Sequence, residues 1–441
     1  MRLLNVKTYG FEDFLGDAIE PYGIFSHTWM TPSKDEATHG DMLRPEVAAG
    51  KPGFSFGRSS IAVARLRKTA WSGFGSTRAA LKRRQGENHS SYVPGFVELS
   101  EAINSMFRWY RDAETCYAYL SGVDSVEQLQ TLGHRPPLPT PSSWVNGFHR
   151  SWTLQELLAP RDVRFYCASW QLLGTKYSLT STIAAITGIA EDILCHRRDF
   201  FQVPAAIRMH WASRRVASRI ENEAYSLLGL FDVNMPLLYG EGPKAFQRLQ
   251  QKILKQSEDC TLLLWNSDTG CDMIAWDDGK TAWTPQPILA SKPADFAAAV
   301  AKPGFAPVPP GHFRDFKMTT PERGLRMNLL KADDLLHISG SASSLFDRSN
   351  PAGRPARLCL GLLNCAVQSQ MRDERDDREF VAIVLRPRYD ATMYTDGRSS
   401  YNSSGIYERL GPGFFVIPKS DFLNRKKWRL STVFLAASPS S

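Results

Sequence analysis

Residues 98–120 read ELSEAINSMFRWYRDAETCYAYL, and this stretch decides the fold class. Ser100 is a suitable N-cap, and the apolar residues after it recur at i, i+3, i+4 and i+7, which predicts a helix with one buried face. These apolar residues are Ile103, Met106, Phe107 and Tyr110. Residues 116–120 then form a short apolar run that is typical of a buried strand. A strand that follows an amphipathic helix in this way favours an α/β sheet.

The alternation of strands and helices extends to both sides of this stretch. Apolar runs typical of strands lie at residues 2–8, 22–26 and 163–167. Residues 153–158 predict a short helix that stops near Pro160. Further helical patterns cover residues 178–187, 205–214, 221–231 and 243–257. Pro243 suits the first turn of the last of these helices, whose apolar stripe consists of Phe246, Leu249, Ile253 and Leu254.

The character of the sequence changes at Cys260. From there on, short apolar segments are separated by Gly, Pro, Asn and Asp, which predicts a mostly β domain of the sandwich or barrel type. The chain has 441 residues, more than the ~250 to 300 over which a single hydrophobic core keeps growing. We therefore expect two domains, residues 1–257 and residues 258–441.

Composition indicates a soluble protein without a targeting segment. Glu12 and Asp13 interrupt the N-terminal sequence before an apolar run forms, which argues against a signal peptide. No stretch approaches the ~18 to 20 apolar residues of a membrane-spanning helix, so we expect a cytoplasmic location. The seven cysteines are widely spaced and include no Cys-x-x-Cys pair, so neither a disulfide framework nor a metal site is expected. Cys195 and His196 are adjacent but lack companions for a metal or nucleophile role.

A basic block occupies residues 56–86. It holds eight basic residues and no Asp or Glu, and because the net charge of the chain is +8, the remainder is neutral. The basic residues are Arg58, Arg65, Arg67, Lys68, Arg78, Lys82, Arg83 and Arg84. With Trp71 and Phe74 between them, they superficially suggest a nucleic-acid site or a localisation signal.

Four long motifs flank or follow this block in a recognisable order. They read GIFSHTW (residues 23–29), ELSEAINSMFRWYR (98–111), WTLQELLAP (152–160) and EAYSLLGLFDVNMPLLYGEG (223–242). Together they resemble the fungal heterokaryon incompatibility (HET) domain over roughly the first 255 residues. The resemblance implies a TIR-like or Rossmann-like α/β domain with a parallel sheet, a C-terminal extension of unestablished role, and a part in non-self recognition and regulated cell death.

The family has a buried strand, approximately GLEWVWIDTCCIDK, where this chain carries the basic block. The codons TGG ATC GAC ACG TGC TGC encode Trp-Ile-Asp-Thr-Cys-Cys; read from the second base, they encode Gly-Ser-Thr-Arg-Ala-Ala, the sequence of residues 75–80. We therefore interpret residues 56–97 as translated out of frame, and expect residues 57–95 to be irregular. The alternative is a divergent basic loop. On the first interpretation the block indicates no nucleic-acid partner, and we expect the chain as written to be inactive.

The motif residues are the candidate site. They are Ser26, His27, Thr28, Trp29, Trp152, Thr153, Leu154, Gln155, Glu156, Arg219, Glu221, Tyr225, Tyr239, Gly240, Glu241 and Gly242. His27 and Trp29 should lie at the carboxyl end of a strand, where open α/β sheets bind ligands. The alternative is that His27 bonds locally and Trp29 fills the core. Met30 stands where the family has glycine.

Glu156 is the candidate for catalysis that the resemblance suggests. HET domains are considered remotely similar to TIR domains, some of which cleave NAD with one glutamate, and a carboxylate could stabilise a developing cationic sugar. The simpler interpretation is a carboxylate at a helix start beside a buried Trp152. Ser151 stands where the family has glycine, a further departure. No cofactor is expected, with NAD only as a possible substrate.

The remaining motif residues have structural interpretations. Arg215, Arg219 and Glu221 fall in a charged family stretch that would normally be solvated, and Asn222 stands where aspartate is usual. Residues 239–242 predict a turn that leads into the last helix. They do not predict a phosphate loop, because they lack its Lys-Ser/Thr and a preceding strand. The sequence leaves two functions open: a signalling module that acts through protein partners or self-association, or an NAD-cleaving hydrolase.

Overall fold

The computed structural model describes the chain in segments. They are residues 2–5, 11–13, 21–27, 78–80, 96–120, 122–133, 146–167, 169–257, 259–265, 285–297, 305–307, 318–319, 324–332, 346–347, 356–357, 359–368, 378–387, 406–417 and 429–436. Contacts divide the chain into two units: residues 1–202 with 215–239, and residues 203–214 with 240–441. The boundary expected at residue 257 stays a prediction.

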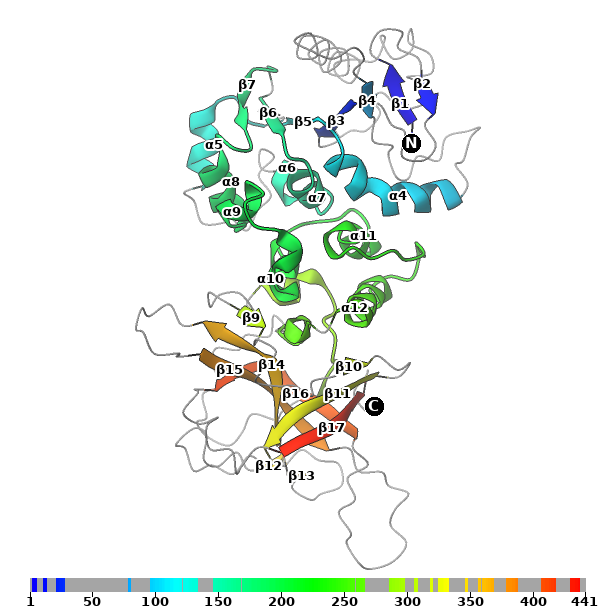
Figure 1. Cartoon of the computed structure of the whole chain (residues 1–441), viewed down its shortest axis with the longest axis vertical. Coiled ribbons are helices and arrows are strands. Elements are labelled where there is room, and N and C mark those ends of the chain that lie inside the picture. Colours follow the sequence, from blue (N-terminus) through cyan, green and yellow to red (C-terminus); the bar gives the residue numbers. More distant parts are fainter. Residues whose placement is uncertain are drawn as a thin grey trace, which may run out of the picture. The chain divides into compact units, whose positions relative to one another are not determined.

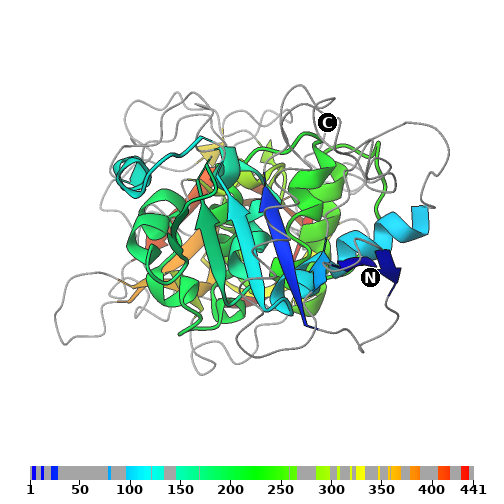
Figure 2. The same ribbon diagram turned by 90° about the horizontal axis from the view of Figure 1, so that it is seen from above.

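The first unit contains a seven-stranded mixed sheet in the order β2-β1-β4-β3-β5-β6-β7 (Figure 1). Its strands are β1 (Arg2–Asn5), β2 (Phe11–Asp13), β3 (Tyr22–His27), β4 (Arg78–Ala80), β5 (Thr115–Tyr119), β6 (Val163–Tyr166) and β7 (Leu172–Thr175). The four strands from β4 to β6 pair in parallel, while β1, β2 and β7 pair antiparallel. In Figure 2, β3 (blue), β5 (cyan) and β6 (green) lie side by side. The α/β character is confirmed.

Helix α4 (Phe96–Arg111) is the amphipathic helix predicted ahead of β5. Its stripe Ile103, Met106, Phe107 and Tyr110 is buried, as the spacing requires. A 3-10 turn, η4 (Gly229–Phe231), approaches the helix so closely that a Cβ on Gly229 would lie 2.1 Å from Cβ of Phe107. A glycine is therefore required at this contact.

Most of the basic block lies outside the described residues, but three of its residues form β4. Arg78 pairs with Asn5 of β1 on one side and with Tyr22 of β3 on the other. The expectation of irregular structure over residues 57–95 is wrong for these three residues, because their backbone occupies a place inside the sheet. This is also the place where the family pattern requires a strand, so the out-of-frame interpretation stays a prediction.

Short helices complete the first unit. They are α5 (Val126–Gly133), α6 (Asn146–His149), α7 (Thr153–Leu158), α8 (Thr180–Thr187), α9 (Glu191–Leu194), η3 (Phe200–Gln202) and α11 (Glu221–Tyr225). Helix α7 ends before Pro160 as predicted and contacts both α4 and α6. The single helix expected over residues 221–231 is instead divided into α11 and η4. Bonds from Leu227 N to Ala224 O and from Leu228 N to Tyr225 O span only three residues and tighten the chain there.

The second unit contains two α-helices, α10 (Ala205–Ala212) and α12 (Lys244–Gln256), and two 3-10 helices, η5 (Cys260–Leu263) and η6 (Pro293–Phe296). The stripe predicted for α12 is buried. Ten strands are described: β8 (Pro285–Gln286), β9 (Phe305–Pro307), β10 (Met318–Thr319), β11 (Gly324–Ala332), β12 (Phe346–Asp347), β13 (Ala356–Arg357), β14 (Cys359–Gln368), β15 (Arg378–Pro387), β16 (Ile406–Ile417) and β17 (Arg429–Ala436). Strand β11 pairs with both β17 and β14, so β11, β17, β16, β15 and β14 pair in a ring.

No helix in the described part of the chain is long and apolar enough to cross a membrane.

Candidate functional site

Helix α7 carries a buried carboxylate into the interior of the first unit. Residues 154–158 are all buried, and Glu156 is only 2% exposed. A charged group is costly to bury unless hydrogen bonds or opposite charges replace its water. The partners of Glu156 therefore define the site.

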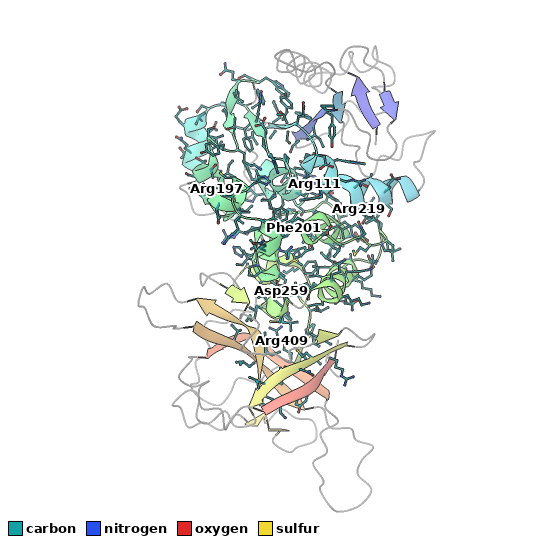
Figure 3. The ribbon with its side chains drawn as sticks, viewed as in Figure 1. Arg111, Arg197, Phe201, Arg219, Asp259 and Arg409 are labelled. Carbon is teal, nitrogen blue, oxygen red and sulfur yellow. The ribbon has the colours of Figure 1, made fainter. Side chains whose placement is uncertain are left out.

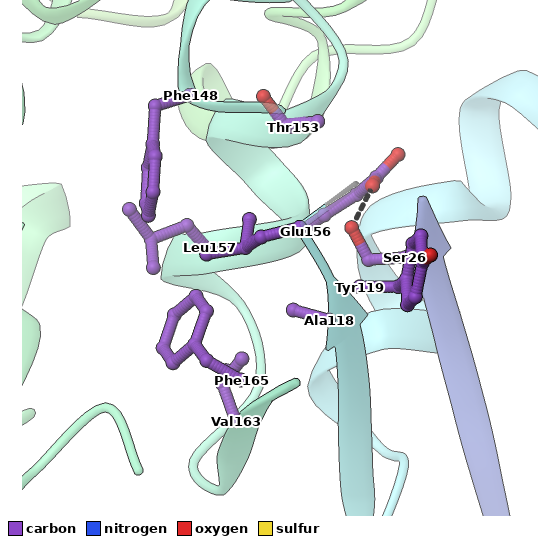
Figure 4. Close-up of a pocket in the computed structure, with 10 residues that line it drawn as sticks. Ser26, Ala118, Tyr119, Phe148, Thr153, Glu156, Leu157, Val163 and Phe165 are labelled. Carbon is purple, nitrogen blue, oxygen red and sulfur yellow. Dashed lines mark hydrogen bonds between the residues drawn. The ribbon is translucent and has the colours of Figure 1, made fainter. Parts of the chain in front are cut away.

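Ser26, at the carboxyl end of β3, is the direct partner of Glu156. Its hydroxyl donates a hydrogen bond to Oε2 of Glu156 at 2.5 Å, and both residues are buried (Figure 4). The end of β3 lies beside the ends of the parallel strands β5 and β6. Open α/β sheets bind their ligands at this edge. The sequence placed Ser26 in a motif but gave no signal that it would meet a residue 130 positions away.

Tyr110 and Arg215 complete the surroundings of the carboxylate. The Tyr110 hydroxyl donates to Phe25 O at 3.1 Å, and burial, followed by its charge and hydrogen-bond interactions with Glu156, raises the pKa of Tyr110 well above its usual value. Burial lowers the pKa of Arg215 to about 9, and the attraction of Glu156 opposes this change. Arg215 is consequently still a cation at neutral pH. The site combines one carboxylate, two hydroxyl groups and one guanidinium.

Arg215 also holds the start of α7. Its Nη1 donates to Arg150 O and to Oγ1 of Thr153, both at 3.1 Å, while Oγ1 of Thr153 donates to Arg150 O at 2.8 Å. The expectation of a solvated charge is therefore wrong for Arg215, and it is also wrong for Glu221, which is buried. Both errors have the same cause, because sequence spacing does not show which side of a short segment meets the core.

A small cavity adjoins Glu156. Its volume is about 30 Å³, more than the ~10 to 15 Å³ that a single water molecule needs. Its lining residues are Ser26, Ala118, Tyr119, Leu120, Phe148, Thr153, Glu156, Leu157, Val163 and Phe165 (Figure 4). Among the described residues, the cavity is partly open and has room for a water molecule beside the carboxylate.

The other residues of the first and third motifs have varied positions. His27 is the last residue of β3, while its side chain and all of Thr28 and Trp29 lie outside the described residues. Trp152 is half-buried and precedes α7 without a side-chain cap, which differs from the buried Trp152 expected. Leu154 is buried, and Nε2 of Gln155 lies 3.2 Å from Sδ of Met106.

A second group of motif residues surrounds Tyr239. The guanidinium of Arg219, which is labelled in Figure 3, lies 5.0 Å from the centre of the Tyr239 ring. The Tyr239 hydroxyl donates to Oδ1 of Asn222 at 3.0 Å. The buried Tyr225 accepts a hydrogen bond from Leu238 N at 2.8 Å and contacts the Tyr239 ring edge to face. Asn222 thus supplies an acceptor where the family has aspartate.

Residues 240–242 form a turn before α12. Gly240 and Gly242 have φ of +101° and +60°, conformations that favour glycine. Glu241 forms an ion pair with Arg248, with Nε of Arg248 at 2.9 Å from Oε2. Within the described residues, no group of three or more His, Cys, Asp and Glu is arranged to hold a metal ion.

Comparison with known proteins identifies a relative. Over 260 residues, 58% of its length, the chain is 37% identical to vegetative incompatibility protein HET-E-1 of Podospora anserina. The chain spans 18% of the length of that protein. No family model matches the chain, and no solved structure matches it. The similarity confirms the resemblance read from the four sequence motifs and relates the chain to the fungal heterokaryon incompatibility proteins.

Proposed function

We propose that this chain acts in fungal heterokaryon incompatibility, as an effector or signalling module that promotes regulated cell death on non-self recognition. The observation that carries the proposal is the similarity over 260 residues to a vegetative incompatibility protein. The module is TIR-like, acts in the cytoplasm through protein partners or self-association, and is followed by a mostly β domain. The mixed sheet of the first unit, with its parallel centre, supports this assignment.

A second candidate function is hydrolysis of NAD, and the surroundings of Glu156 favour it. A buried carboxylate with a serine donor lies at the ligand-binding edge of the parallel strands. In such a reaction the bond between ribose and nicotinamide breaks, nicotinamide leaves as a neutral molecule, and water adds to the sugar carbon with release of a proton. The carboxylate would stabilise the positive charge that develops on the sugar.

The size of the cavity ranks this candidate second. A volume of about 30 Å³ is far below the ~300 to 1,000 Å³ of small-molecule sites. The carboxylate is also engaged by Ser26 already. A nucleotide would therefore have to displace the Ser26 hydroxyl and widen the cavity, whereas a signalling module requires neither change.

Expression in a fungal host tests both candidates. We expect a frame-corrected chain to kill the cells and the chain as written to be inactive. NAD is measured in parallel with viability, for the corrected chain and for its Glu156→Gln variant, with the exposed Glu127→Gln as control. Death with unchanged NAD supports the signalling module, and loss of NAD that requires Glu156 supports the hydrolase. A corrected chain that neither kills nor consumes NAD would contradict the proposal.

The genomic DNA and its spliced transcript test the frame separately. We expect the DNA under residues 70–80, read one base earlier, to encode a sequence close to Leu-Glu-Trp-Val-Trp-Ile-Asp-Thr-Cys-Cys. Such a near-continuous apolar run suits a strand inside a parallel sheet. Codons incompatible with that run would show that residues 56–97 are a genuine basic insertion.

A further inference from the structure

A second buried charge meets the opposite end of the helix that carries Glu156. Lys176, immediately after β7, is 3% exposed, and its ammonium donates to Leu157 O at 3.1 Å and to Pro160 O. Both carbonyls belong to the last turn of α7 or to the residues just after it. Carbonyls at a helix C-terminus lack partners within the helix and carry partial negative charge, so a cation there stabilises the helix end.

His196 supplies the third acceptor for this ammonium group. Its Nε2 lies 2.9 Å from Nζ of Lys176 and 3.0 Å from Pro160 O. A lysine ammonium has three hydrogens and no lone pair, so Nε2 can take part only as an acceptor. With the proton on Nδ1, the neutral imidazole accepts from Lys176, and each of the three Lys176 hydrogens has one acceptor. With the proton on Nε2, the neutral imidazole instead donates to Pro160 O. Both tautomers are uncharged, and both keep the ring against the ammonium group.

A second proton on the imidazole is incompatible with this arrangement. It would place an N–H of a cation against the Lys176 ammonium, at a separation that is now 2.9 Å. Burial first, and the charge of Lys176 second, lower the pKa of His196 below its usual value, while its hydrogen bond with Pro160 O acts in the opposite direction and does not outweigh them. Burial likewise lowers the pKa of Lys176 to about 8, so Lys176 is still mostly charged at neutral pH.

The other charged groups nearby do not compensate for a protonated His196. Arg161 lowers its pKa further, and Asp199 acts in the opposite direction as the weakest of these influences. Three groups raise the pKa of Lys176, namely Cys116, Cys195 and Asp162. Of these, Asp162 already pairs with Arg164 at 2.9 Å. On the chain itself, the next residues are Arg197 and Arg198, and Arg198 pairs with Asp192.

His196 lies where its imidazole could rotate away from Lys176 into solvent. The residue as a whole is exposed, while its ring nitrogen Nε2 lies against Lys176 and Pro160 O. Its φ of +53° is a left-handed conformation that is uncommon for residues other than glycine. Backbone bonds from His196 N to Ile193 O at 3.0 Å and from Arg197 N to Asp192 O at 2.8 Å hold this turn. Rotation of the side chain alone would carry the imidazole into solvent.

We propose that Lys176 is a positioning residue for α7, the helix that carries Glu156. Protonation of His196 breaks the contact between His196 and Lys176 and so loosens the end of that helix. The contact between Lys176 and His196 is then an acid-sensitive latch on the Glu156 site, and its biological meaning rests on the function proposed above. Because the pKa of His196 is lowered in the latched state, the opened state binds the proton first. The contact between Lys176 and His196 stabilises the end of α7 fully above pH ~6.5, and this stabilisation is lost as the pH falls below that value.

Hydrogen exchange of the full chain tests the latch without any assay of function, so its result is independent of the proposed activity. At about pH 5.5 an exposed histidine of ordinary pKa is about ten times more protonated than free, so opening should be more favourable than at about pH 7.5, by up to about tenfold. We expect the amides of residues 157–159 to exchange faster at the lower pH, by up to about tenfold, after correction for intrinsic rates. The Ser257 amide, bonded to Ile253 O at the end of α12, is the internal reference.

Two substitutions at His196 separate the latch from general acid sensitivity. His196→Gln keeps an acceptor at similar reach but does not titrate, so this pH effect should disappear. His196→Asn suits the left-handed backbone but is too short to reach Lys176, so exchange at residues 157–159 should already be fast at the higher pH. His210→Gln is the control, because His210 also has a lowered pKa but bonds to Phe296 O. A full pH effect in His196→Gln, or normal protection in His196→Asn, would overturn the proposal.

Discussion

Glu156 in the first unit and Arg409 in the second are both charged and buried, but their partners differ in kind. Arg409, which lies in β16 and is labelled in Figure 3, donates from Nη1 to Leu263 O at 2.9 Å and from Nη2 to Trp265 O at 3.0 Å. Its guanidinium lies 4.3 Å from the centre of the Trp265 ring. Glu156 instead meets the side chains of Ser26, Tyr110 and Arg215, from three separate segments, beside a cavity.

The difference indicates what each charge does. Backbone carbonyls and a stacked ring fix Arg409 to one segment of chain, and burial lowers its pKa to about 9 with no opposing carboxylate among the causes. Such an arrangement fastens the chain after η5 to the sheet. The partners of Glu156 are instead side chains from separate segments, and the cavity beside it can take a molecule of water. We therefore expect substitutions at Arg409 to affect stability more than those at the Glu156 site, and substitutions at the Glu156 site to affect function more.

The largest loss of stability is expected for Arg409→Met. The change leaves Leu263 O and Trp265 O without their donors, and each buried unsatisfied carbonyl costs ~1 to 3 kcal/mol. Removal of a desolvated charge offsets part of this cost, so we expect a net loss of about 3 kcal/mol in the free energy of unfolding. Thermal melting, with hydrogen exchange of residues 259–265, measures it. Arg326→Met is the control, since Arg326 is exposed on β11; equal effects of the two changes would contradict the structural role of Arg409.

A smaller loss is expected for Ser26→Ala. The buried carboxylate of Glu156 then lacks one donor, and a hydrogen bond to a charged group contributes ~1.5 to 3 kcal/mol. We expect a loss of about 2 kcal/mol by the same melting measurement. Ser226→Ala is the matched control, because Ser226 is fully buried but its hydroxyl has no hydrogen-bond partner among the described residues. If both serines prove equally dispensable, Ser26 is not a partner of Glu156 in solution.

These residues also mark what the sequence could and could not predict. The stripes of α4 and α12 were predictable because each depends on a local period that burial confirms. The break between α11 and η4 was not, because it depends on how closely Gly229 approaches Phe107. Ser26 and Glu156 meet across 130 residues, and no spacing predicts such a pair.

The charged residues were the least predictable. Arg215 was expected in solvent, and nothing in the sequence marked Lys176, because a cation with carbonyl partners and a solvated cation have the same sequence signature. What distinguishes them is the presence of unpaired carbonyls nearby, such as Leu157 O for Lys176 and Arg150 O for Arg215. Those carbonyls are placed by the fold of other segments. Sequence motifs therefore found α7 and Glu156 but not the side chains that hold them.

The smallest change in stability is expected for Glu156→Gln, and it completes the comparison with Arg409. The amide oxygen can still accept the Ser26 hydrogen bond, and the desolvated negative charge is gone, while attraction to Arg215 is lost. These terms oppose one another, so we expect a loss of about 1 kcal/mol in the free energy of unfolding. A double-mutant cycle with Ser26→Ala should show a coupling of about 1 kcal/mol, because the two residues share one hydrogen bond. If Glu156→Gln instead destabilises the protein as much as Arg409→Met, then the carboxylate is a structural charge like Arg409, and a loss of function in that variant would report unfolding and not chemistry.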